Sequence, residues 1–183
     1  MLLPTSLDVN GQPYRIRTDF RDILNILAAF EDPELQPEEK MFVCLRVLYE
    51  DCETIPEEDM GAAYTAAIQF IDAGMDSEGG SGPKTMDWEQ DAPILFPAVN
   101  HVAGYETRSV EYLHWWTFVG FFMEIRESVY STVLHVRAKK AKGKKMEKWE
   151  KDFWNANKKL CILQTKLTAE EKAEKDRLNA MLN

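Results

Sequence analysis

A carboxylate and an imidazole stand one helical turn apart near the middle of the sequence, at Glu111 and His114. This Glu-x-x-His spacing is half of the ligand set with which helical bundles hold two iron ions. A complete site needs a second pair of the same kind, and the sequence contains none. The simpler interpretation is a histidine at a helix boundary that makes one hydrogen bond, so we predict no bound metal.

Three carboxylates, Asp87, Glu89 and Asp91, precede an apolar segment with helical periodicity. They could bind a cation, but a calcium loop also requires regularly spaced ligands and a turn glycine. Acids at a helix N-terminus more simply accept hydrogen bonds from free N–H groups and complement the helix dipole. We therefore interpret this cluster as the start of a helix.

Other catalytic signals are sparse. The only imidazoles are those of His101, His114 and His135, and no serine or cysteine stands beside a histidine and an acid in the sequence. The glycine-rich residues 79–84 lack the spacing and the preceding strand of a phosphate-binding loop. The three cysteines are expected to be reduced, ordinary thiols. We therefore expect no enzymatic activity and no cofactor.

Charge is distributed unevenly along the chain, whose net charge is −9. Residues 1–136 carry eight basic and 24 acidic groups, whereas residues 137–160 carry ten basic and three acidic groups. The basic segment, whose lysines are interleaved with aromatic residues, could hold phosphates and stack on bases. It could equally lie on an acidic protein partner, or be a solvated helix whose aromatics pack. Because the acidic body would repel a nucleic-acid backbone, nucleic-acid binding is the weaker alternative.

Apolar periodicity predicts an all-α protein, a compact bundle of about six helices that follows a short N-terminal β-hairpin. The hairpin is predicted over residues 7–16, where apolar and polar residues alternate on both sides of Asn10-Gly11, a dipeptide suited to a tight turn. Proline, glycine and capping residues separate the helical repeats that follow. Thr18 or Asp19 can cap the first helix, and Thr168 can form a capping box with Glu171 at the start of the last. Pro97 is expected to kink or divide its helix, and Gly104 to end it. The expected helices cover residues 20–30, a segment that opens at Pro37, another that opens at Pro56, residues 87–102, residues 109–138, a segment from the Lys-rich stretch through Leu160, and a short terminal helix after Thr168.

The longest expected helix, residues 109–138, is predicted to be central because its apolar residues cover more than a narrow stripe. We expect an acidic helical core with the hairpin at residues 1–136, including a flexible loop at residues 76–85, and a basic helical C-terminal arm at residues 137–183. No apolar run approaches the roughly 20 residues that span a bilayer. The N-terminus also lacks a secretory signal, so we expect a cytoplasmic protein and no membrane partner.

Several segments stand out as a set. They are the leading Leu3-Pro4, Asn-Gly-Gln-Pro-Tyr-Arg-Ile-Arg-Thr-Asp-Phe-Arg at residues 10–21, Met-Asp-Trp-Glu-Gln-Asp-Ala at residues 86–92, Tyr-Leu-His-Trp-Trp-Thr-Phe at residues 112–118, and Val136-Arg137 with the Lys-rich stretch after it. Together they resemble the bacteriophage gene-product-fifteen proteins of long-tailed phages that infect Gram-positive bacteria. The resemblance extends over nearly the whole chain.

This resemblance implies a gene near the tape measure gene and a tail assembly chaperone or adaptor. Such a protein would bind the tape measure protein and other tail proteins in the host cytoplasm and be absent from the mature virion. A tape measure protein is long, helical and apolar along much of its length, so a partner that covers it would prevent aggregation. The family supplies no catalytic motif. The alternatives are a minor structural component of the tail or tail junction and, third, a nucleic-acid-binding module that uses the basic arm; self-association is left open.

Contacts with such a partner are expected from aromatic residues of the central helix and from the basic arm. The candidates are Trp115, Phe118, Phe121, Phe122, Lys144, Lys145, Trp149, Phe153 and Trp154. For any one of the aromatic side chains, a place in the core is the simpler interpretation.

Overall fold

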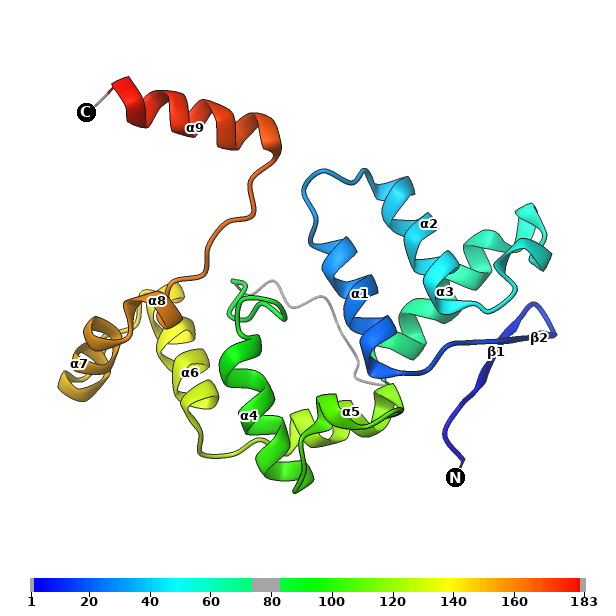
Figure 1. Cartoon of the computed structure of the whole chain (residues 1–183), viewed down its shortest axis with the longest axis horizontal. Helices are drawn as coiled ribbons and strands as arrows, with labels where there is room; N and C mark the ends of the chain where they lie inside the picture. Colours follow the sequence, from blue (N-terminus) through cyan, green and yellow to red (C-terminus); the bar gives the residue numbers. More distant parts are fainter. Residues whose placement is uncertain (1, 74–82, 182–183) are drawn as a thin grey trace.

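The computed structural model describes residues 2–73 and 83–181, and over these ranges the chain is mainly α-helical. The all-α prediction with an N-terminal hairpin is confirmed, although the described residues form nine helices where about six were expected. Figure 1 shows an elongated arrangement, with the hairpin at one end and residues 129–161 at the other. No helix in these ranges is both long enough and apolar enough to cross a membrane. The predicted loop at residues 76–85 falls mostly outside the described residues.

The chain begins with an antiparallel hairpin of β1 (Ser6–Val9) and β2 (Gln12–Arg15). Between the strands, Asn10 and Gly11 have φ angles of 51° and 86°. A two-residue hairpin turn requires this left-handed conformation, which asparagine and glycine adopt more readily than other residues. Val9 of β1 is buried in the core.

Three helices follow the hairpin: α1 (Phe20–Phe30), α2 (Pro37–Leu48) and α3 (Met60–Ile71). Asp19 caps α1 as predicted, because its carboxylate accepts a hydrogen bond from the Arg21 N–H at 3.0 Å. Pro37 is the first residue of α2, where a missing N–H costs no helical bond. The third helix begins later than the predicted Pro56, because residues 57–59 form a 3-10 turn.

The next helix, α4 (Ala92–Ala103), was predicted over residues 87–102. The acidic segment before it, residues 87–91, forms a turn instead of the first turn of the helix, so α4 begins five residues later than expected. Pro97 was expected to kink or divide the helix, but α4 runs through it. Gly104 ends α4 with a φ of 78°, as predicted.

The prediction of one central helix over residues 109–138 is wrong. Two helices occupy this region, α5 (Trp115–Met123) and α6 (Val129–Ala141). His114 starts α5 by accepting the Trp116 N–H on Nδ1 at 3.0 Å, and Ser128 starts α6 with a capping box. The break allows both helices to pack against α4, whereas one straight helix would leave much of its apolar surface without a partner.

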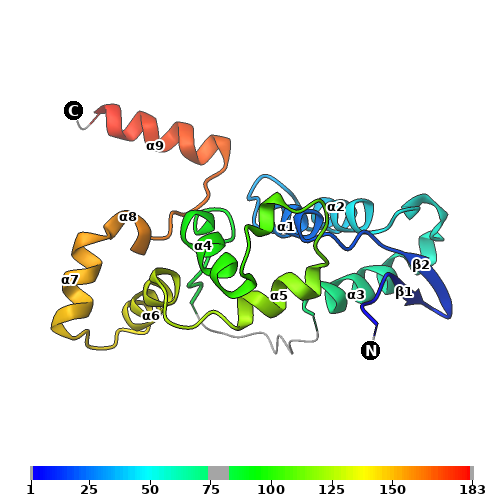
Figure 2. The ribbon, with the colours of Figure 1, turned by 60° about the horizontal axis from the view of Figure 1, so that its bottom comes forward.

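The C-terminal part contains α7 (Lys148–Ala156), α8 (Lys158–Cys161) and α9 (Ala169–Met181). The single helix predicted through Leu160 is divided at Asn157, which ends α7. Thr168 and Glu171 form the predicted capping box at the start of α9, with hydrogen bonds of 2.9 and 3.1 Å. Figure 2 shows that α9 stands apart from the other helices.

Buried side chains form two clusters. The hairpin and α1–α5 build the main core, with Tyr130 of α6 at its border. Val133, Val136 and Cys161 build a second, smaller cluster, which side chains of α7 and α8 cover. Ile94 of α4 contacts both clusters and links them. The boundary predicted after residue 136 therefore falls within α6.

Candidate partner-binding surface

Two of the segments that carry the family resemblance lie side by side in the structure. The Phe20 N–H donates to the Leu113 carbonyl at 3.0 Å, and the Trp115 N–H donates to the Thr18 carbonyl at 2.7 Å. The Asp19 carboxylate also accepts the Leu113 N–H at 3.0 Å. These bonds join the start of α1 to the start of α5, so the residues of both segments act in folding.

His114 is committed to this junction and is not free to bind a metal. Its Nδ1 accepts the Trp116 N–H, so Nε2 carries the proton and donates to the Pro4 carbonyl at 3.0 Å. The histidine stands at a helix boundary, as the simpler interpretation held, but it makes two hydrogen bonds instead of one. Within the described ranges, no group of three or more histidine, cysteine and acidic residues is placed to hold a metal ion.

A buried ion pair that sequence reasoning missed joins α4 to α6. The two guanidinium nitrogens of Arg137 each lie 2.7 Å from an oxygen of Asp91, and the two side chains are only 3% and 2% exposed. Arg137 also donates to the carbonyl oxygens of Thr85, Leu160 and Cys161. One side chain thus holds together the turn before α4, the helix α6 and the short helix α8.

Asp87, interpreted from sequence as a capping residue, does cap the turn that precedes α4. Its Oδ1 accepts the N–H groups of Glu89 and Gln90 at 3.0 and 2.8 Å. Burial by itself would raise the pKa of Asp87, but these N–H groups and the Lys84 ammonium at 3.1 Å outweigh it, so the pKa is lowered. Lys84 also pairs with Glu31 at 2.7 Å, which ties the turn to the end of α1.

A third buried carboxylate, Glu150, joins α7 to α6. It accepts hydrogen bonds from Lys139 Nζ at 2.6 Å, from His135 Nε2 at 2.7 Å and from the Glu147 N–H at 2.6 Å. The Lys139 hydrogen bond contributes most to lowering the pKa of Glu150, to about 2. The ionised carboxylate is therefore part of the fold at neutral pH.

We predict that the protein loses stability in acid because Glu150 becomes protonated. A carboxyl whose pKa falls from 4.5 to about 2 on folding stabilises the protein fully above pH 4.5, and this contribution disappears as the pH drops toward 2. Thermal unfolding followed by circular dichroism should show a steeper fall in Tm over this interval for the wild type than for Glu150→Gln. Asp152→Asn, on the exposed side of α7, should behave as the wild type. Equal slopes in all three proteins would contradict the prediction.

The predicted contact residues of α5 divide between core and surface. Trp115 and Phe118 are buried. The Trp115 indole donates to a carbonyl at the end of α3 at 2.7 Å, and the Phe118 ring stacks on Phe20 with the centroids 4.6 Å apart. Phe121 and Phe122 are half-buried at the edge of the core. Of these four side chains, only Phe121 and Phe122 therefore offer part of a ring to a partner.

The predicted contact residues of the arm are more accessible. Lys144 and Lys145 are exposed on the connection between α6 and α7. Trp149 is 52% exposed and stacks on an imidazole of α6, while Phe153 and Trp154 are half-buried against the second cluster. The structure thus places lysines and a half-exposed indole on one end of the molecule.

An apolar groove that sequence reasoning missed lies between α4 and the start of α6. It has a volume of about 370 Å³. Its lining residues are Pro93, Ile94, Pro97, Ala98, His101, Val102, Ile125, Arg126, Glu127, Ser128 and Val129. Val129 is 53% exposed on its rim. The sequence did contain a sign of this groove. Asn100 and His101 are the only polar residues of α4, so most sides of the helix are apolar, whereas the core covers only one of its faces.

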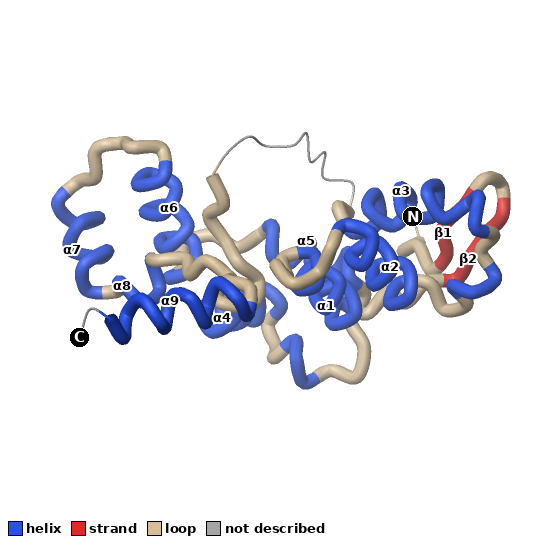
Figure 3. Tube along the Cα trace, turned by 90° about the horizontal axis from the view of Figure 1, so that it is seen from above, coloured by secondary structure: helices blue, strands red, loops and turns tan. Residues whose placement is uncertain are grey.

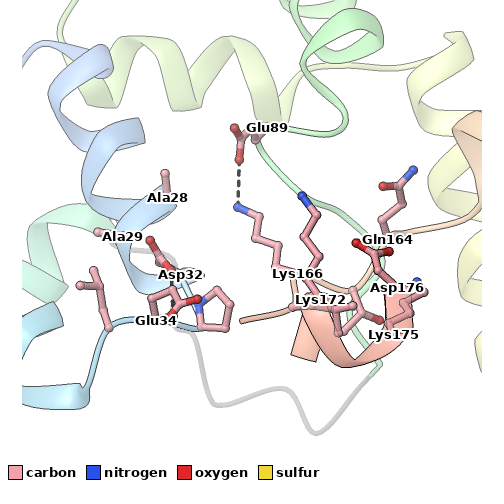
Figure 4. A pocket seen from close by; sticks show the side chains of 14 residues that line it. Ala28, Ala29, Asp32, Glu34, Glu89, Gln164, Lys166, Lys172, Lys175 and Asp176 are labelled. Carbon is pink, nitrogen blue, oxygen red and sulfur yellow. Dashed lines mark hydrogen bonds and ion pairs between the residues drawn. The ribbon is translucent and has the colours of Figure 1, made fainter. Parts of the chain in front are cut away.

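A larger hollow, of about 840 Å³, lies between the end of α1 and the segment that leads into α9 (Figure 4). Carboxylates and ammonium groups line it together, and Glu89 pairs with Lys166 at 3.0 Å. The other charged residues around it are Asp32, Glu34, Lys172, Lys175 and Asp176. Because both signs of charge are mixed, the hollow has no field that selects one ligand charge.

The three cysteines are free and buried, in agreement with the prediction of ordinary thiols. Burial raises the pKa of Cys44 to about 12, and it also raises the pKa of Cys52 and of Cys161. A thiol held in its neutral form is a poor nucleophile.

The model of the family described as Bacteriophage Gp15 protein matches residues 1–163, which include every described element except α9. No curated protein and no solved structure matches the chain significantly.

Proposed function

This chain belongs to the Bacteriophage Gp15 protein family, and from that premise we propose that it is a tail assembly chaperone or adaptor that binds the tape measure protein. The observation that carries the proposal is the family match, which indicates a structural or assembly role in a phage. The protein would act in the host cytoplasm, leave the finished virion, and catalyse no reaction. Nucleic acid is not among the proposed partners.

The groove between α4 and α6 supports this proposal because it suits an amphipathic helix. Such a helix binds by placing apolar side chains from one face into a groove on its partner. Pro97 of α4 and Val129 of α6 line the groove between these helices with exposed apolar surface, and Arg126 and Glu127 add charged groups to the lining. The half-exposed Trp149 and the lysines around it offer a second contact region on the arm.

The buried polar groups support a role without chemistry. In the described ranges, every buried side-chain nitrogen or oxygen has a hydrogen-bond partner within the protein. Among them, the charged groups of Arg137, Asp91 and Glu150 form ion pairs that connect helices. A catalytic site more often keeps such a group accessible to a substrate.

Co-expression with the tape measure protein tests the proposal. We expect the soluble fraction of the tape measure protein to rise several-fold in the presence of this chain, and the two to co-purify. An unchanged soluble fraction would refute the chaperone function. Mass spectrometry of purified virions is the complementary test, because abundant peptides of this chain in mature tails would favour the structural alternative.

A charged substitution in the groove should weaken the same interaction. Val129→Glu places a carboxylate on an apolar wall, and we expect it to reduce co-purification of the tape measure protein by about tenfold, because a desolvated charge disfavours an apolar contact. Phe42→Glu is a matched control, since Phe42 is 63% exposed on α2, away from the groove. Equal binding by both variants would remove the groove from the proposed contact surface.

A further inference from the structure

The two ends of the molecule carry opposite charge. We define the basic end as the exposed lysines from the end of α6 to α7, namely Lys140, Lys142, Lys144, Lys145, Lys148 and Lys151. We define the acidic end as the carboxylates of the connection between α2 and α3, namely Glu50, Asp51, Glu53, Glu57, Glu58 and Asp59. Asn10 at the hairpin turn bonds to Asp59 at 2.6 Å, and Figures 1 and 3 place the hairpin and α7 at opposite ends of the long axis.

Within the part of the chain that the structure describes, ion pairs do not neutralise the basic end. None of the six lysines forms an ion pair with a described residue. Glu150 lies beside them but is buried and already bound to Lys139 and His135. Glu147 and Asp152 are the only exposed carboxylates between residues 139 and 152. An uncompensated positive surface therefore remains, with Trp149 exposed among its lysines.

The acidic end is also incompletely neutralised. The sequence contains no lysine or arginine from residue 47 to residue 83. Arg15 pairs with Glu50 at 3.3 Å, and Arg46 pairs with Glu53 at 2.9 Å. Four carboxylates of this end, those of Asp51, Glu57, Glu58 and Asp59, have no ion pair with any residue in the described ranges.

We propose that the basic end of one copy binds the acidic end of a second copy. The two surfaces differ, so the contact is head-to-tail, and each added copy leaves a free end of each kind. Such contacts close into a ring when the rotation per copy permits it and otherwise continue as a filament. Trp149 supplies a large side chain of the kind that contributes most to protein contacts.

Charge favours a second copy over a nucleic acid as the occupant of the basic end. The chain has a net charge of −9, and the acidic residues 1–136 would repel a phosphate backbone bound at the basic end. It also repels a second copy, but that repulsion is spread over the surface and is screened beyond about 10 Å at 0.1 M salt. At the proposed contact, the six ammonium groups would meet an end where Asp51, Glu57, Glu58 and Asp59 form no ion pair within the described residues.

Sedimentation velocity at two salt concentrations tests the proposal. At about 0.1 M salt the average mass of the wild type should rise with concentration above that of the 21.1 kDa monomer, and at about 1 M salt it should return to the monomer. The variants K144E/K145E and E57K/E58K should each weaken association by about tenfold or more, because each places like charges opposite one another. K172E/K175E, on α9, makes the same charge change as K144E/K145E and should assemble as the wild type.

Mixing the two deficient variants distinguishes a head-to-tail contact from other assemblies. The intact acidic end of K144E/K145E fits the intact basic end of E57K/E58K, and the two reversed ends again carry opposite charges, so an equimolar mixture should assemble although neither variant assembles alone. A wild type that is monomeric at all concentrations overturns the proposal, and so does normal assembly of both variants. Binding of duplex DNA by a monomeric wild type, lost in K144E/K145E, would assign the basic end to nucleic acid and also overturn it.

Discussion

Replacement of Arg137 by methionine is expected to lower the free energy of unfolding by about 3–5 kcal/mol, the cost of leaving a buried charge without its partner. Asp91, only 2% exposed, would lose its ion-pair partner and both hydrogen bonds from the guanidinium. The carbonyls of Thr85, Leu160 and Cys161 would lose their donor at the same time. Urea unfolding followed by circular dichroism measures the change.

Two further variants show whether the missing partner is the cause. Lys142→Met removes an exposed lysine just beyond the end of α6 and should change the free energy of unfolding by less than about 0.5 kcal/mol. The double variant Arg137→Met/Asp91→Leu should be more stable than Arg137→Met alone, because it leaves no unpaired buried charge. If Arg137→Met unfolds at the wild-type urea concentration, the ion pair does not hold these helices together.

Replacement of Trp115 by alanine is expected to lower the free energy of unfolding by about 3–5 kcal/mol, the usual cost of removing a large aromatic side chain from a core. The indole is 2% exposed, stacks near Phe118 with the centroids 5.9 Å apart, and donates to the Ile71 carbonyl. Its removal would leave both a cavity and an unpaired carbonyl. Equilibrium unfolding in urea measures the effect.

Trp149→Ala is the matched control, because the same side chain is removed from a site that is 52% exposed. We expect it to change the free energy of unfolding by less than about 1 kcal/mol. A similar loss in the two variants would show that Trp149 also belongs to the core. A small loss for Trp149 leaves its side chain available for a protein contact, either with the tape measure protein or with a second copy.

The elements that sequence patterns predicted well are those whose cause is local. Asn10-Gly11 adopts the left-handed turn of the hairpin, Asp19 caps α1, Gly104 ends α4, and Thr168 forms a capping box. Each of these features depends on the φ angle or the side-chain oxygen of a residue within about one turn of the chain. Such interactions can be read without knowledge of the rest of the fold.

The central helix shows where this approach fails. Apolar residues continue through residues 109–138, so periodicity alone predicted one helix. His114 and Ser128 both start new helices, and neither is preceded by a proline or a glycine that would have marked the break. Periodicity shows that a face is apolar, but it does not show which neighbour the face will meet.

For the same reason, the sequence predicted only part of the candidate surface. The aromatic residues of α5 looked alike in the sequence, yet Trp115 and Phe118 are covered while Phe122 remains at the edge. The groove beside Val129 arises only because α6 packs against α4. The partners of Arg137 lie 46 residues away at Asp91 and 24 residues away at Cys161, distances over which no spacing rule applies.

By itself the sequence determined the helical class, the hairpin, several helix ends and the uneven charge, because these follow from composition and from interactions between near neighbours. Only the tertiary structure decided which aromatic residues are buried, which carboxylates are paired, and that the basic and acidic segments lie at opposite ends of the molecule. Burial and pairing depend on contacts between residues distant in the chain, and those contacts exist only after the helices have packed.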